Sequence, residues 1–472
     1  MSGAAGVAPP GPRGGERPWA GRRIHMIGVG GAGMSAYARA AHALGAEVSG
    51  SDGADSDYAR RLAADGVLQA AIGHSPENVP GGEGVEVYFS SAVAEQNVER
   101  VAARERGLPE RSRAELLGEL SALRRTIAVA GTHGKTTTAS MIARALLAAG
   151  MQPGWLIGAP IGGGLANAEW GEGEWLVVEA DESDRSMLSL DVEIAVLTNV
   201  ELDHHASFAS LAELREVFRS FLSGASEAVL WDRQELLALR DGPLVAYDAQ
   251  HVELTEGGSR FQWRGHGVEL SVPGLHNALD ATGALEASRL AGAPPEAAIA
   301  ALAEFSGAGR RFQPLGRSER GARLFEDYAH HPTEVAATLR AARTLPHERL
   351  VAVFQPHLFS RTKLLAREFG VALAEADVIA VLDVYPARER QADFPGVSGL
   401  LIAEAAADAA RGRPVYWLPG FTAARTVLAG MLAEGDLCVV MGAGDVEQLG
   451  RDLAANSEAP AGEGGADEEA AA

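Results

Sequence analysis

The chain has 472 residues, of which 47% are hydrophobic and 22% are charged, a composition typical of globular proteins. Its 63 acidic and 41 basic residues give a formal net charge of −22, which argues against nucleic-acid or anionic-membrane partners, because both need a positive field. No apolar run approaches the roughly 20 residues of a membrane span, the N-terminus lacks a signal-peptide core, and the single cysteine excludes an intrachain disulfide, so we expect a cytoplasmic protein.

Short apolar runs alternate with alanine-rich stretches, which predicts an α/β fold built from βαβ units. The glycine- and proline-rich residues 1–20 and the acidic residues 454–472 are expected to be disordered, because neither can bury a core. Between them we expect three domains. These are an N-terminal Rossmann-like domain (21–120), a central P-loop ATPase domain with a mixed or parallel sheet and small antiparallel hairpins (121–313), and a C-terminal Rossmann-like domain (314–453).

The first block contains a glycine-rich turn between a strand and a helix. We expect strands at Ile24–Val29, Ala46–Gly50 and Val85–Ser90, and a helix at Ala32–Leu44. Gly28, Gly30 and Gly33 match the pattern G-x-G-x-x-G, and Asp52 follows Gly28 by 24 residues, near the distance of a ribose-binding acid. Such a turn binds a diphosphate at a helix N-terminus, whether in NAD, FAD or a UDP-sugar. The candidate ligand residues are Gly28, Gly30, Gly31, Ala32, Gly33, Asp52, Ser90 and Ser91.

The second block opens with the strongest local signal, a variant phosphate loop. The strand Thr126–Ala130 and the helix Lys135–Ala149 flank a turn made of Gly131, Thr132, His133, Gly134, Lys135, Thr136 and Thr137. The usual first glycine of the motif is replaced by Val129. Backbone N–H groups of such a loop surround phosphate oxygens, the lysine reaches the β- and γ-phosphates, and the hydroxyl of Thr136 is offered to Mg²⁺. Lys135 is one of two lysines in the chain.

Polar residues end two further strands of this block, Trp175–Glu179 and Ile194–Thr198. Ligands bind at the carboxyl ends of strands in open α/β sheets. Glu179 and His204 are therefore candidate metal ligands beside Thr136, and a site with two Mg²⁺ ions is consistent with phosphoryl transfer.

The remaining expected elements complete the second block and form the third. Hairpin strands are expected at Val252–Thr255, Ser259–Trp263 and Val268–Val272, and helices at His276–Leu290 and Pro295–Phe305. In the third block, strands are expected near Arg323–Asp327, Leu350–Phe354, Val378–Leu382, Val415–Leu418 and Leu437–Met441.

In this order, the motifs resemble those of one family, the ATP-dependent Mur ligases of peptidoglycan precursor synthesis, over about residues 22–450. Besides the two glycine motifs, eight stretches carry the resemblance: Glu179–Asp184, Thr198–His204, Pro273–Asn277, Gly309–Phe312, Glu326–Glu334, Phe354–His357, Asp383–Tyr385 and Gly442–Asp445. The runs Gly30–Ser35 and His330–Glu334 are similar to those of the member that adds L-alanine. One departure is Asp280, which stands where the family usually has asparagine.

The resemblance implies a ligase that joins L-alanine to the lactyl carboxylate of UDP-N-acetylmuramate through an acyl phosphate, with ATP and Mg²⁺, in cell-wall biogenesis. It implies that Lys135 and Thr136 hold the phosphates and the first Mg²⁺, that Glu179 bridges the metals, and that His204 binds the second. His276 and Asn277 would contact adenosine. Arg311, Asp327 and His331 would reach ATP across the cleft from the C-terminal domain. His357 and Arg361 would serve the acyl phosphate or the alanine carboxylate.

Three alternatives stay open at this point. A recycling ligase would add a tripeptide to the same sugar nucleotide, although the run Gly30–Ser35 argues against it. A dehydrogenase would leave the phosphate loop without a purpose, and a P-loop switch would leave the third block unexplained. The sequence does not distinguish L-alanine, glycine and L-serine, or a monomer and a homodimer. By residue type, the amine proton could pass to His204, His205, His331 or His357.

Overall fold

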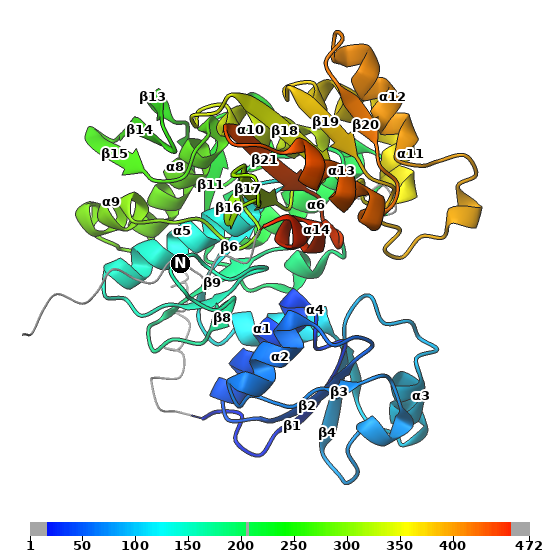
Figure 1. Cartoon of the computed structure of the whole chain (residues 1–472). Helices are drawn as coiled ribbons and strands as arrows, with labels where there is room; N and C mark the ends of the chain where they lie inside the picture. The colour runs from blue at the N-terminus through cyan, green and yellow to red at the C-terminus, as the bar shows by residue number, and fades with distance from the viewer. Residues whose placement is uncertain (1–16, 204–206, 455–472) are drawn as a thin grey trace, which may run out of the picture. The chain divides into compact units, whose positions relative to one another are not determined.

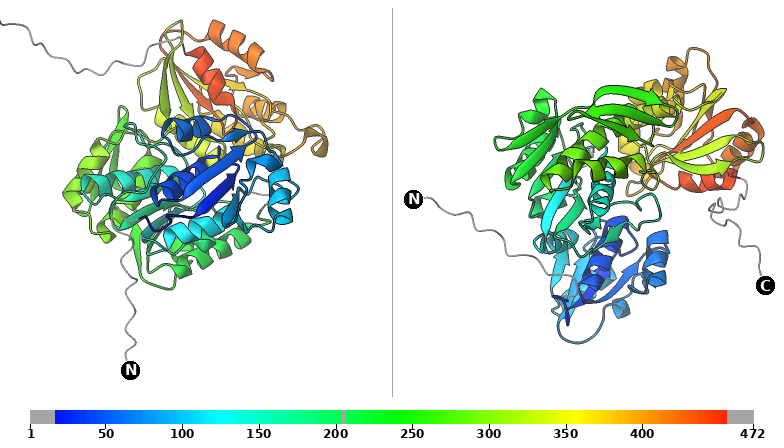
Figure 2. Two further views of the ribbon diagram at one scale, coloured as in Figure 1. Left: turned by 90° about the horizontal axis from the view of Figure 1, so that it is seen from below. Right: turned by 90° about the vertical axis from the view of Figure 1, so that its left-hand side faces the viewer.

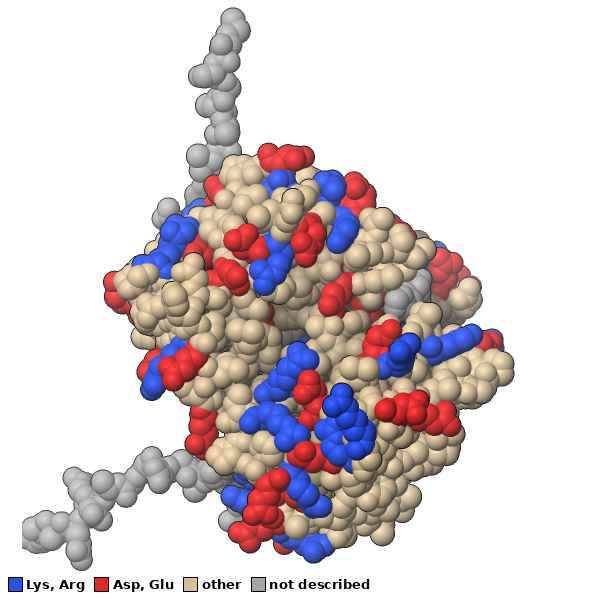
Figure 3. All heavy atoms as spheres, turned by 90° about the horizontal axis from the view of Figure 1, so that it is seen from above, with Lys and Arg blue, Asp and Glu red and all other residues tan. Residues whose placement is uncertain are grey.

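The computed structural model describes residues 17–203 and 207–454 (Figure 1). The chain divides into two compact units, Met1–Gly309 and Arg310–Ala472. Within the described ranges, no helix combines the length and the apolar character needed to cross a membrane. Acidic and basic side chains are intermixed on the face shown in Figure 3.

A five-stranded parallel sheet opens the first unit, in the order β3-β2-β1-β4-β5. Its strands are β1 (Arg23–Ile27), β2 (Glu47–Asp52), β3 (Ala71–Ile72), β4 (Val85–Phe89) and β5 (Glu110–Ser112), and its helices are α1 (Ala32–Ala43), α2 (Asp57–Ala64), α3 (Val98–Glu105) and α4 (Arg113–Ser121). Apolar residues of α1, α2 and α4 pack on one face of the sheet and those of α3 on the other (Figure 2). Both faces are therefore covered, as the all-parallel arrangement requires.

The folded chain begins earlier than predicted. We expected residues 1–20 to be disordered, but residues 17–20 form a turn in which Trp19 is 6% exposed and its N–H donates to the Leu44 carbonyl over 3.0 Å. The Arg22 guanidinium stacks over the Trp19 ring at 4.2 Å. One large aromatic ring buries enough apolar surface to order a short polar segment, which composition alone does not reveal. The other residues of the two predicted tails, 1–16 and 455–472, lie outside the described ranges.

A seven-stranded sheet follows, in the order β12-β11-β10-β6-β9-β7-β8, parallel except for the β7–β8 pair. Its strands are β6 (Arg125–Ala130), β7 (Gly154–Leu156), β8 (Ala168–Glu169), β9 (Trp175–Glu179), β10 (Ile194–Leu197), β11 (Glu227–Trp231) and β12 (Leu244–Tyr247). Its helices are α5 (Lys135–Ala148), α6 (Leu211–Gly224), α7 (Gln234–Leu237), α8 (Leu275–Leu290) and α9 (Pro295–Ala303). Because β6, β9 and β10 are neighbours, the polar residues that follow them meet at one sheet edge.

The first two sheets of this unit share one apolar core. Leu156 of β7, with Leu176 and Val178 of β9, packs in the same cluster as Met34 of α1 and Leu116 of α4. Polar contacts accompany it: the Asn167 amide donates to the Ala32 carbonyl over 3.0 Å. The first α/β layer is thus fixed against the second by a continuous buried surface.

The predicted hairpins form a separate three-stranded antiparallel sheet of β13 (Gln250–Thr255), β14 (Gly258–Trp263) and β15 (His266–Leu270). Alternate residues of β14, among them Phe261 and Trp263, face the core that contains α5 and α8. This alternation is expected of an antiparallel sheet with one buried face.

The second unit is a six-stranded sheet in the order β16-β17-β21-β18-β19-β20, with β16 alone antiparallel. Its strands are β16 (Gln313–Arg317), β17 (Arg323–Asp327), β18 (Arg349–Phe354), β19 (Val378–Val381), β20 (Val415–Trp417) and β21 (Asp436–Met441). Helices α10 (Pro332–Ala342), α11 (Phe359–Leu373) and α12 (Leu400–Ala409) pack on one face, and α13 (Phe421–Met431) and α14 (Val446–Leu453) on the other. Cys438 is fully buried in β21, and burial raises the pKa of its thiol.

The predicted α/β architecture is confirmed, including the antiparallel hairpins, the parallel N-terminal sheet and a mainly parallel C-terminal sheet. Most predicted strands lie within two or three residues of the observed ones. The exact domain boundaries stay predictions; the compact division falls between Gly309 and Arg310, slightly before the predicted boundary at 313.

The core shared by the first two sheets generates a stability prediction. Leu176 is fully buried, so Leu176→Ala should lower the free energy of unfolding of the first unit by about 2–5 kcal/mol, through lost apolar contact and a cavity. Urea unfolding followed by tryptophan fluorescence measures this free energy, because six of the seven tryptophans lie in the first unit. The control is Leu254→Ala, at a residue that is 45% exposed, and it should change the free energy of unfolding by less than about 0.5 kcal/mol. Equal effects of the two changes would contradict the shared core.

Candidate active site

The phosphate loop joins β6 to α5 and leaves no space for side chains at its two glycines. Gly131 has a φ of 134° and Gly134 has a φ of 82°, both in the region that favours glycine. A β-carbon at Gly131 would collide with the Thr198 hydroxyl, and one at Gly134 would lie 2.5 Å from Oδ1 of Asp280. The loop is therefore enclosed by the segment after β10 on one side and by α8 on the other.

Residues after β10 hydrogen-bond the loop directly. The Asn199 side-chain oxygen accepts from the His133 N–H at 2.9 Å, and the Thr198 hydroxyl donates to the His133 carbonyl at 2.5 Å. The Thr132 hydroxyl donates to the Glu201 carbonyl at 3.0 Å, and Nε2 of His133 lies 2.9 Å from the Glu201 carboxylate. These contacts satisfy loop groups that the flanking strand and helix leave unpaired.

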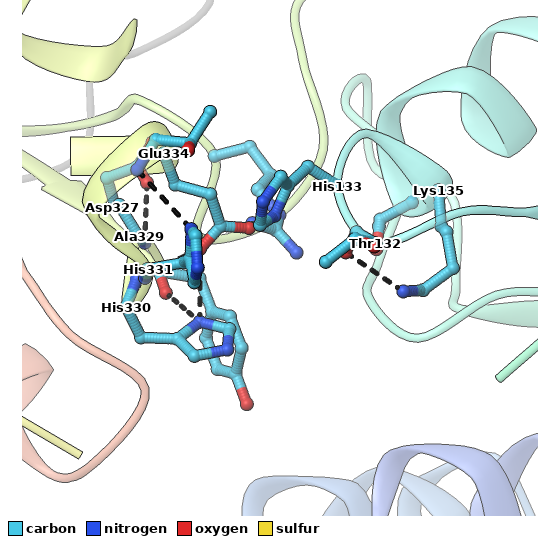
Figure 4. A network of polar contacts seen from close by, with 12 residues as sticks. Thr132, His133, Lys135, Asp327, Ala329, His330, His331 and Glu334 are labelled. Atoms are coloured by element: carbon cyan, nitrogen blue, oxygen red, sulfur yellow. Dashed lines mark hydrogen bonds and ion pairs between the residues drawn. The ribbon is translucent and has the colours of Figure 1, made fainter. Parts of the chain in front are cut away.

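Lys135 lies at the first residue of α5, and its ammonium points back into the loop (Figure 4). Nζ donates to the carbonyls of Gly131 at 2.6 Å and Thr132 at 3.1 Å. It also lies 3.0 Å from the carboxylate of Glu182, which is fully buried. Burial alone would lower the pKa of Lys135, but Glu182, Asp181 and Glu179 outweigh it and raise the pKa. The lysine is thus charged and held at the loop.

Thr136 and Glu179, two predicted metal ligands, are in contact. The Thr136 hydroxyl donates to Oε1 of Glu179 over 2.9 Å, and Oε2 accepts from the Gly158 N–H over 2.7 Å. These are oxygen donors at a strand end beside a phosphate loop, the type of donor set that Mg²⁺ prefers. The third predicted ligand, His204, lies outside the described residues, as does His205.

The turn between β1 and α1 is the second glycine-rich site. Gly28 has a φ of 83°, and a β-carbon at Gly30 would lie 2.7 Å from Oγ of Ser56 and 2.9 Å from the Asp52 carboxylate. Gly31 is the N-cap of α1, so Ala32 and Gly33 present N–H groups of the first helical turn. Glycine is thus required at Gly28 by its backbone conformation and at Gly30 by close packing, independently of any ligand.

Asp52, which we interpreted as a ribose-binding acid, bonds to the turn itself in this structure. Its Oδ2 accepts from the Gly30 N–H at 2.8 Å and its Oδ1 from the Ala54 N–H at 3.1 Å. Ser90 packs beside Gly28, and its hydroxyl accepts from the Ala92 N–H at 3.4 Å. Ser91 is exposed on the adjoining turn.

The candidate adenosine residues begin helix α8. His276 is half-buried, and the buried Asn277 donates its side-chain amide to the Pro273 carbonyl over 2.7 Å. Asp280, one turn further along, is 7% exposed and lies against Gly134 of the phosphate loop. Residues of α8 are therefore adjacent to the phosphate loop, although they are distant in sequence.

In the second unit, Asp327 ends β17 and stabilises the chain around it (Figure 4). Its carboxylate accepts from the Ala329 N–H at 2.7 Å and from the Phe312 N–H at 2.8 Å. Burial raises the pKa of Asp327 to about 6, although Arg311 and the two backbone N–H groups act in the opposite direction. A buried carboxyl with a raised pKa at a strand end is a candidate functional group.

His331 caps helix α10 rather than projecting from its middle. Its Nδ1 accepts from the Thr333 N–H at 3.4 Å, and Glu334 accepts from the N–H groups of His330 and His331 at 3.0 and 3.2 Å. Because a backbone N–H is always a donor, the neutral His331 ring carries its proton on Nε2. Its Nε2 is then a donor and does not accept a proton directly.

Two arginines flank the Tyr328 ring. The guanidinium of Arg310 lies 4.7 Å and that of Arg311 5.1 Å from the ring centroid. Arg310 also pairs with Glu447 at 2.9 Å, and Arg311 lies 3.9 Å from Glu334. Cation–π contact thus holds both cations at Tyr328, and Arg311 is the one that lowers the pKa of Asp327.

His357, just before α11, and Arg361, in its first turn, are in contact. Nδ1 of His357 accepts from Nη1 of Arg361 at 3.2 Å, and the imidazole stacks on Tyr385 at 5.8 Å between centroids. An arginine only donates, so the neutral His357 ring also carries its proton on Nε2.

Sequence reasoning did not select several residues that organise these sites. Glu182 lies in a motif that we identified, but we chose Glu179 because it ends the strand. Asn199 and Glu201 lie in the Thr198–His204 motif, in which we predicted a role for His204 alone. Arg113, which pairs with Asp181 and Asp184, has no local motif to indicate it. Its only sequence signal is a helix start after Ser112.

Three family profiles match the chain in succession: "Mur ligase family, catalytic domain" over residues 23–125, "Mur ligase middle domain" over 129–288, and "Mur ligase, glutamate ligase domain" over 310–444. The UDP-N-acetylmuramate–L-alanine ligase of Saccharopolyspora erythraea is 42% identical, over 93% of this chain and 94% of that protein. The enzyme of the same name from Mycolicibacterium smegmatis is 41% identical, over 92% and 94%.

Solved structures give the same picture. The UDP-N-acetylmuramate–alanine ligase of Thermotoga maritima superposes with a TM-score of 0.77 at 26% identity, over 91% of this chain and 98% of that one. A murein peptide ligase from Psychrobacter arcticus superposes with a TM-score of 0.69 at 24% identity, over 92% and 98%, a likeness of fold alone.

The raised pKa of Asp327 predicts a pH dependence of stability. A carboxyl with an ordinary pKa of 3.8 and a folded pKa of about 6 stabilises the fold below pH 4 and loses that contribution as the pH rises through 6. Relative to Asp327→Asn, the free energy of unfolding of the native protein should fall by roughly 2 kcal/mol between pH 4 and 7. Hydrogen exchange of β21 amides in both proteins, compared at equal pH, measures it. A difference between the two proteins that stays constant from pH 4 to pH 7 would refute the raised pKa. Such a constant part is expected in any case, because asparagine loses one of the two backbone contacts of the carboxylate, so only the change of the difference with pH is diagnostic.

Proposed function

The chain belongs to the Mur ligase family, and on that premise we propose that its two glycine-rich turns serve one reaction, the ATP-dependent joining of L-alanine to UDP-N-acetylmuramate. The observation that carries the proposal is the phosphate loop, in which a charged Lys135 and the Thr136–Glu179 pair lie at the same strand edge. The products are UDP-N-acetylmuramoyl-L-alanine, ADP and phosphate.

The chemistry proceeds in two steps on the ligase reading. The lactyl carboxylate attacks the γ-phosphate of ATP, so that an acyl phosphate forms and ADP leaves. The amine of L-alanine, once deprotonated, then attacks the acyl carbon, and the tetrahedral intermediate collapses to the amide and phosphate. Lys135 offsets negative charge on the phosphoryl oxygens during the first step. In phosphoryl transfer, such positioned charge supplies most of the stabilisation of the transition state. Gly131–Thr137 holds the phosphates through its N–H groups.

Mg²⁺ fits the oxygen donors of Thr136 and Glu179, which lie 2.9 Å apart. When bound, it would neutralise phosphate charge and align the reacting oxygens. His204 remains our proposed ligand for a second ion. The Thr136–Glu179 hydrogen bond keeps the carboxylate turned toward the loop. The two oxygen donors are therefore already close together before Mg²⁺ binds.

The turn of Gly28, Gly30 and Gly31 is proposed to hold the diphosphate of UDP-N-acetylmuramate, with Ala32, Gly33 and Ser90 beside it. Asp52 is proposed for the ribose of this ligand, and its carboxylate also fixes the Gly30 N–H. His276 and Asn277 are proposed for adenosine. In the second unit, Arg311, Asp327 and His331 are proposed for ATP, and His357 and Arg361 for the acyl phosphate or the alanine carboxylate.

The rival readings are weaker. The recycling ligase shares the sugar nucleotide, but the relatives about 42% identical are named for L-alanine addition. A dehydrogenase or a P-loop switch leaves one of the two glycine turns without a ligand. We further propose that the enzyme is cytoplasmic, since a single buried cysteine suits a reducing compartment. We propose that it is a monomer or a homodimer.

Phosphate release tests the proposal. The protein is incubated with ATP, Mg²⁺, UDP-N-acetylmuramate and one amino acid at a time, or with the tripeptide. Release that requires both the sugar nucleotide and L-alanine supports the ligase. Release with the tripeptide alone would identify the recycling enzyme, and release without the sugar nucleotide a simple ATPase.

Lys135→Ala should reduce turnover by about 10³-fold or more, because a principal charge on the transferring phosphoryl group is lost. The chain offers a matched control in Lys363→Ala, which removes the other lysine from an exposed position on α11. Steady-state kinetics with circular dichroism separate lost chemistry from lost folding. Near-normal turnover of the Lys135 variant would refute the assignment.

Gly31→Asp should raise the KM for UDP-N-acetylmuramate at least about tenfold and leave the KM for ATP nearly unchanged. Gly31 has a φ of −81°, and a β-carbon added there would meet nothing nearer than the Gly28 carbonyl at 3.7 Å, so a side chain fits. Aspartate is also a favourable N-cap, so α1 should stay folded while the carboxylate repels the diphosphate. The uncharged Gly31→Asn is the control and should have a smaller effect. An unchanged KM in the aspartate variant would place the sugar nucleotide elsewhere.

A further inference from the structure

Arg113 connects the two glycine-rich sites of the first unit. It is the first residue of α4, and its side chain is 15% exposed. Its Nε donates to Oδ2 of Asp184 at 2.6 Å, and its Nη2 donates to Oδ2 of Asp181 at 3.0 Å and to the Ser186 hydroxyl at 3.3 Å. One guanidinium thus holds three side chains of the segment that follows β9.

The segment Asp181–Ser186 is ordered by these same carboxylates. Oδ1 of Asp181 accepts from the Ser183 N–H at 2.9 Å, and Oδ1 of Asp184 accepts from the Ser186 N–H at 3.0 Å. Each aspartate therefore uses one oxygen for its own turn and the other for Arg113. The segment is anchored by charge as well as by hydrogen bonds.

Glu182 lies inside this segment and reaches the phosphate loop. Its carboxylate is fully buried and lies 3.0 Å from Nζ of Lys135. A displacement of the Asp181–Ser186 segment therefore moves the acid that holds the phosphate-loop lysine. Lys135 must turn from Glu182 toward the nucleotide if it is to contact the β- and γ-phosphates.

On its other side, Arg113 lies against the first turn of α1. Its Nη1 is 3.0 Å from the position of a β-carbon at Gly33, and the Tyr37 hydroxyl is 4.0 Å from the same point. Glycine at 33 is thus explained by the guanidinium beside it. A diphosphate held at this turn would lie in the field of a cation whose other nitrogens bind Asp181 and Asp184.

We propose that Arg113 is a positioning residue that couples the sugar-nucleotide turn of α1 to the phosphate loop, through the Asp181–Ser186 segment and the Glu182–Lys135 pair. The inference rests on the proposed function, because it needs a diphosphate at α1 and ATP at α5. An anion at α1 draws the guanidinium away from the two aspartates, which loosens Glu182 from Lys135. Lys135 is then available to ATP, so each ligand favours binding of the other.

The test measures this coupling directly in the full chain. Affinity for a non-hydrolysable ATP analogue is determined by calorimetry with Mg²⁺, with and without saturating UDP-N-acetylmuramate, and without L-alanine so that no turnover occurs. In the native protein the sugar nucleotide should tighten analogue binding about fivefold or more, a typical coupling. In Arg113→Met the ratio should fall below about twofold, while affinity for the analogue alone changes by less than about threefold.

Arg111→Met is the matched control. Arg111 lies two residues earlier and pairs with Glu119 and Glu86, all within the first α/β layer, so this variant should keep the native ratio. If Arg113→Met fails to fold, Arg113→Lys retains a positive charge beside the aspartates but lacks the guanidinium fork, and its ratio should still fall.

The outcomes are distinguishable from failure of the proposed function. A native protein that ligates L-alanine but shows no coupling, or an Arg113 variant that ligates with the native ratio, overturns this inference alone. A variant whose affinity for the analogue falls equally with and without the sugar nucleotide shows a merely structural residue and also overturns it. If the native protein does not release phosphate with both substrates, the proposed function itself fails.

Discussion

The pairing of Lys135 with Glu182 is the interaction on which both proposed sites of the first unit depend. An ammonium and a carboxylate removed from water cost several kcal/mol each unless they are paired and hydrogen-bonded. Here the loop carbonyls complete the donors of Lys135, and the segment that carries Glu182 is held by Arg113. The phosphate loop, the acidic segment and helix α4 therefore form one charge-balanced network, in which a change at any member alters the others.

Much of this organisation could be predicted because it is written in local patterns. The two glycine turns lie at strand–helix junctions, where periodic apolar runs give way to residues with a special backbone conformation. Gly131 and Gly134 were identified as parts of a phosphate loop from that context alone, and Thr136 and Glu179, chosen separately, lie in contact. The parallel sheets were predicted from short apolar runs that alternate with alanine-rich stretches, the pattern of βαβ units.

What could not be predicted depends on contacts between distant parts of the chain. Arg113 has no local motif, and its pairing with Asp181 arises only because the first sheet packs on the second. The hydrogen bond between the Gly30 N–H and the Asp52 carboxylate is likewise not indicated by the spacing of the glycine motif. Trp19 lies in a segment whose composition indicates disorder, yet one indole ring is enough to order it. In each case tertiary packing decides the role of a residue whose neighbours in sequence carry no signal.

The rarity and placement of the chain's most nucleophilic side chains have a practical consequence for chemical labelling. Cys438 is buried at the centre of β21 with a raised pKa, so its thiol is shielded from alkylating reagents while the fold is intact. Of the two lysines, Lys363 is exposed and Lys135 is enclosed by the phosphate loop. A cysteine introduced at any chosen surface position would thus be the thiol that reacts with a maleimide dye. Fluorescence probes can be attached one at a time, with no prior removal of native residues.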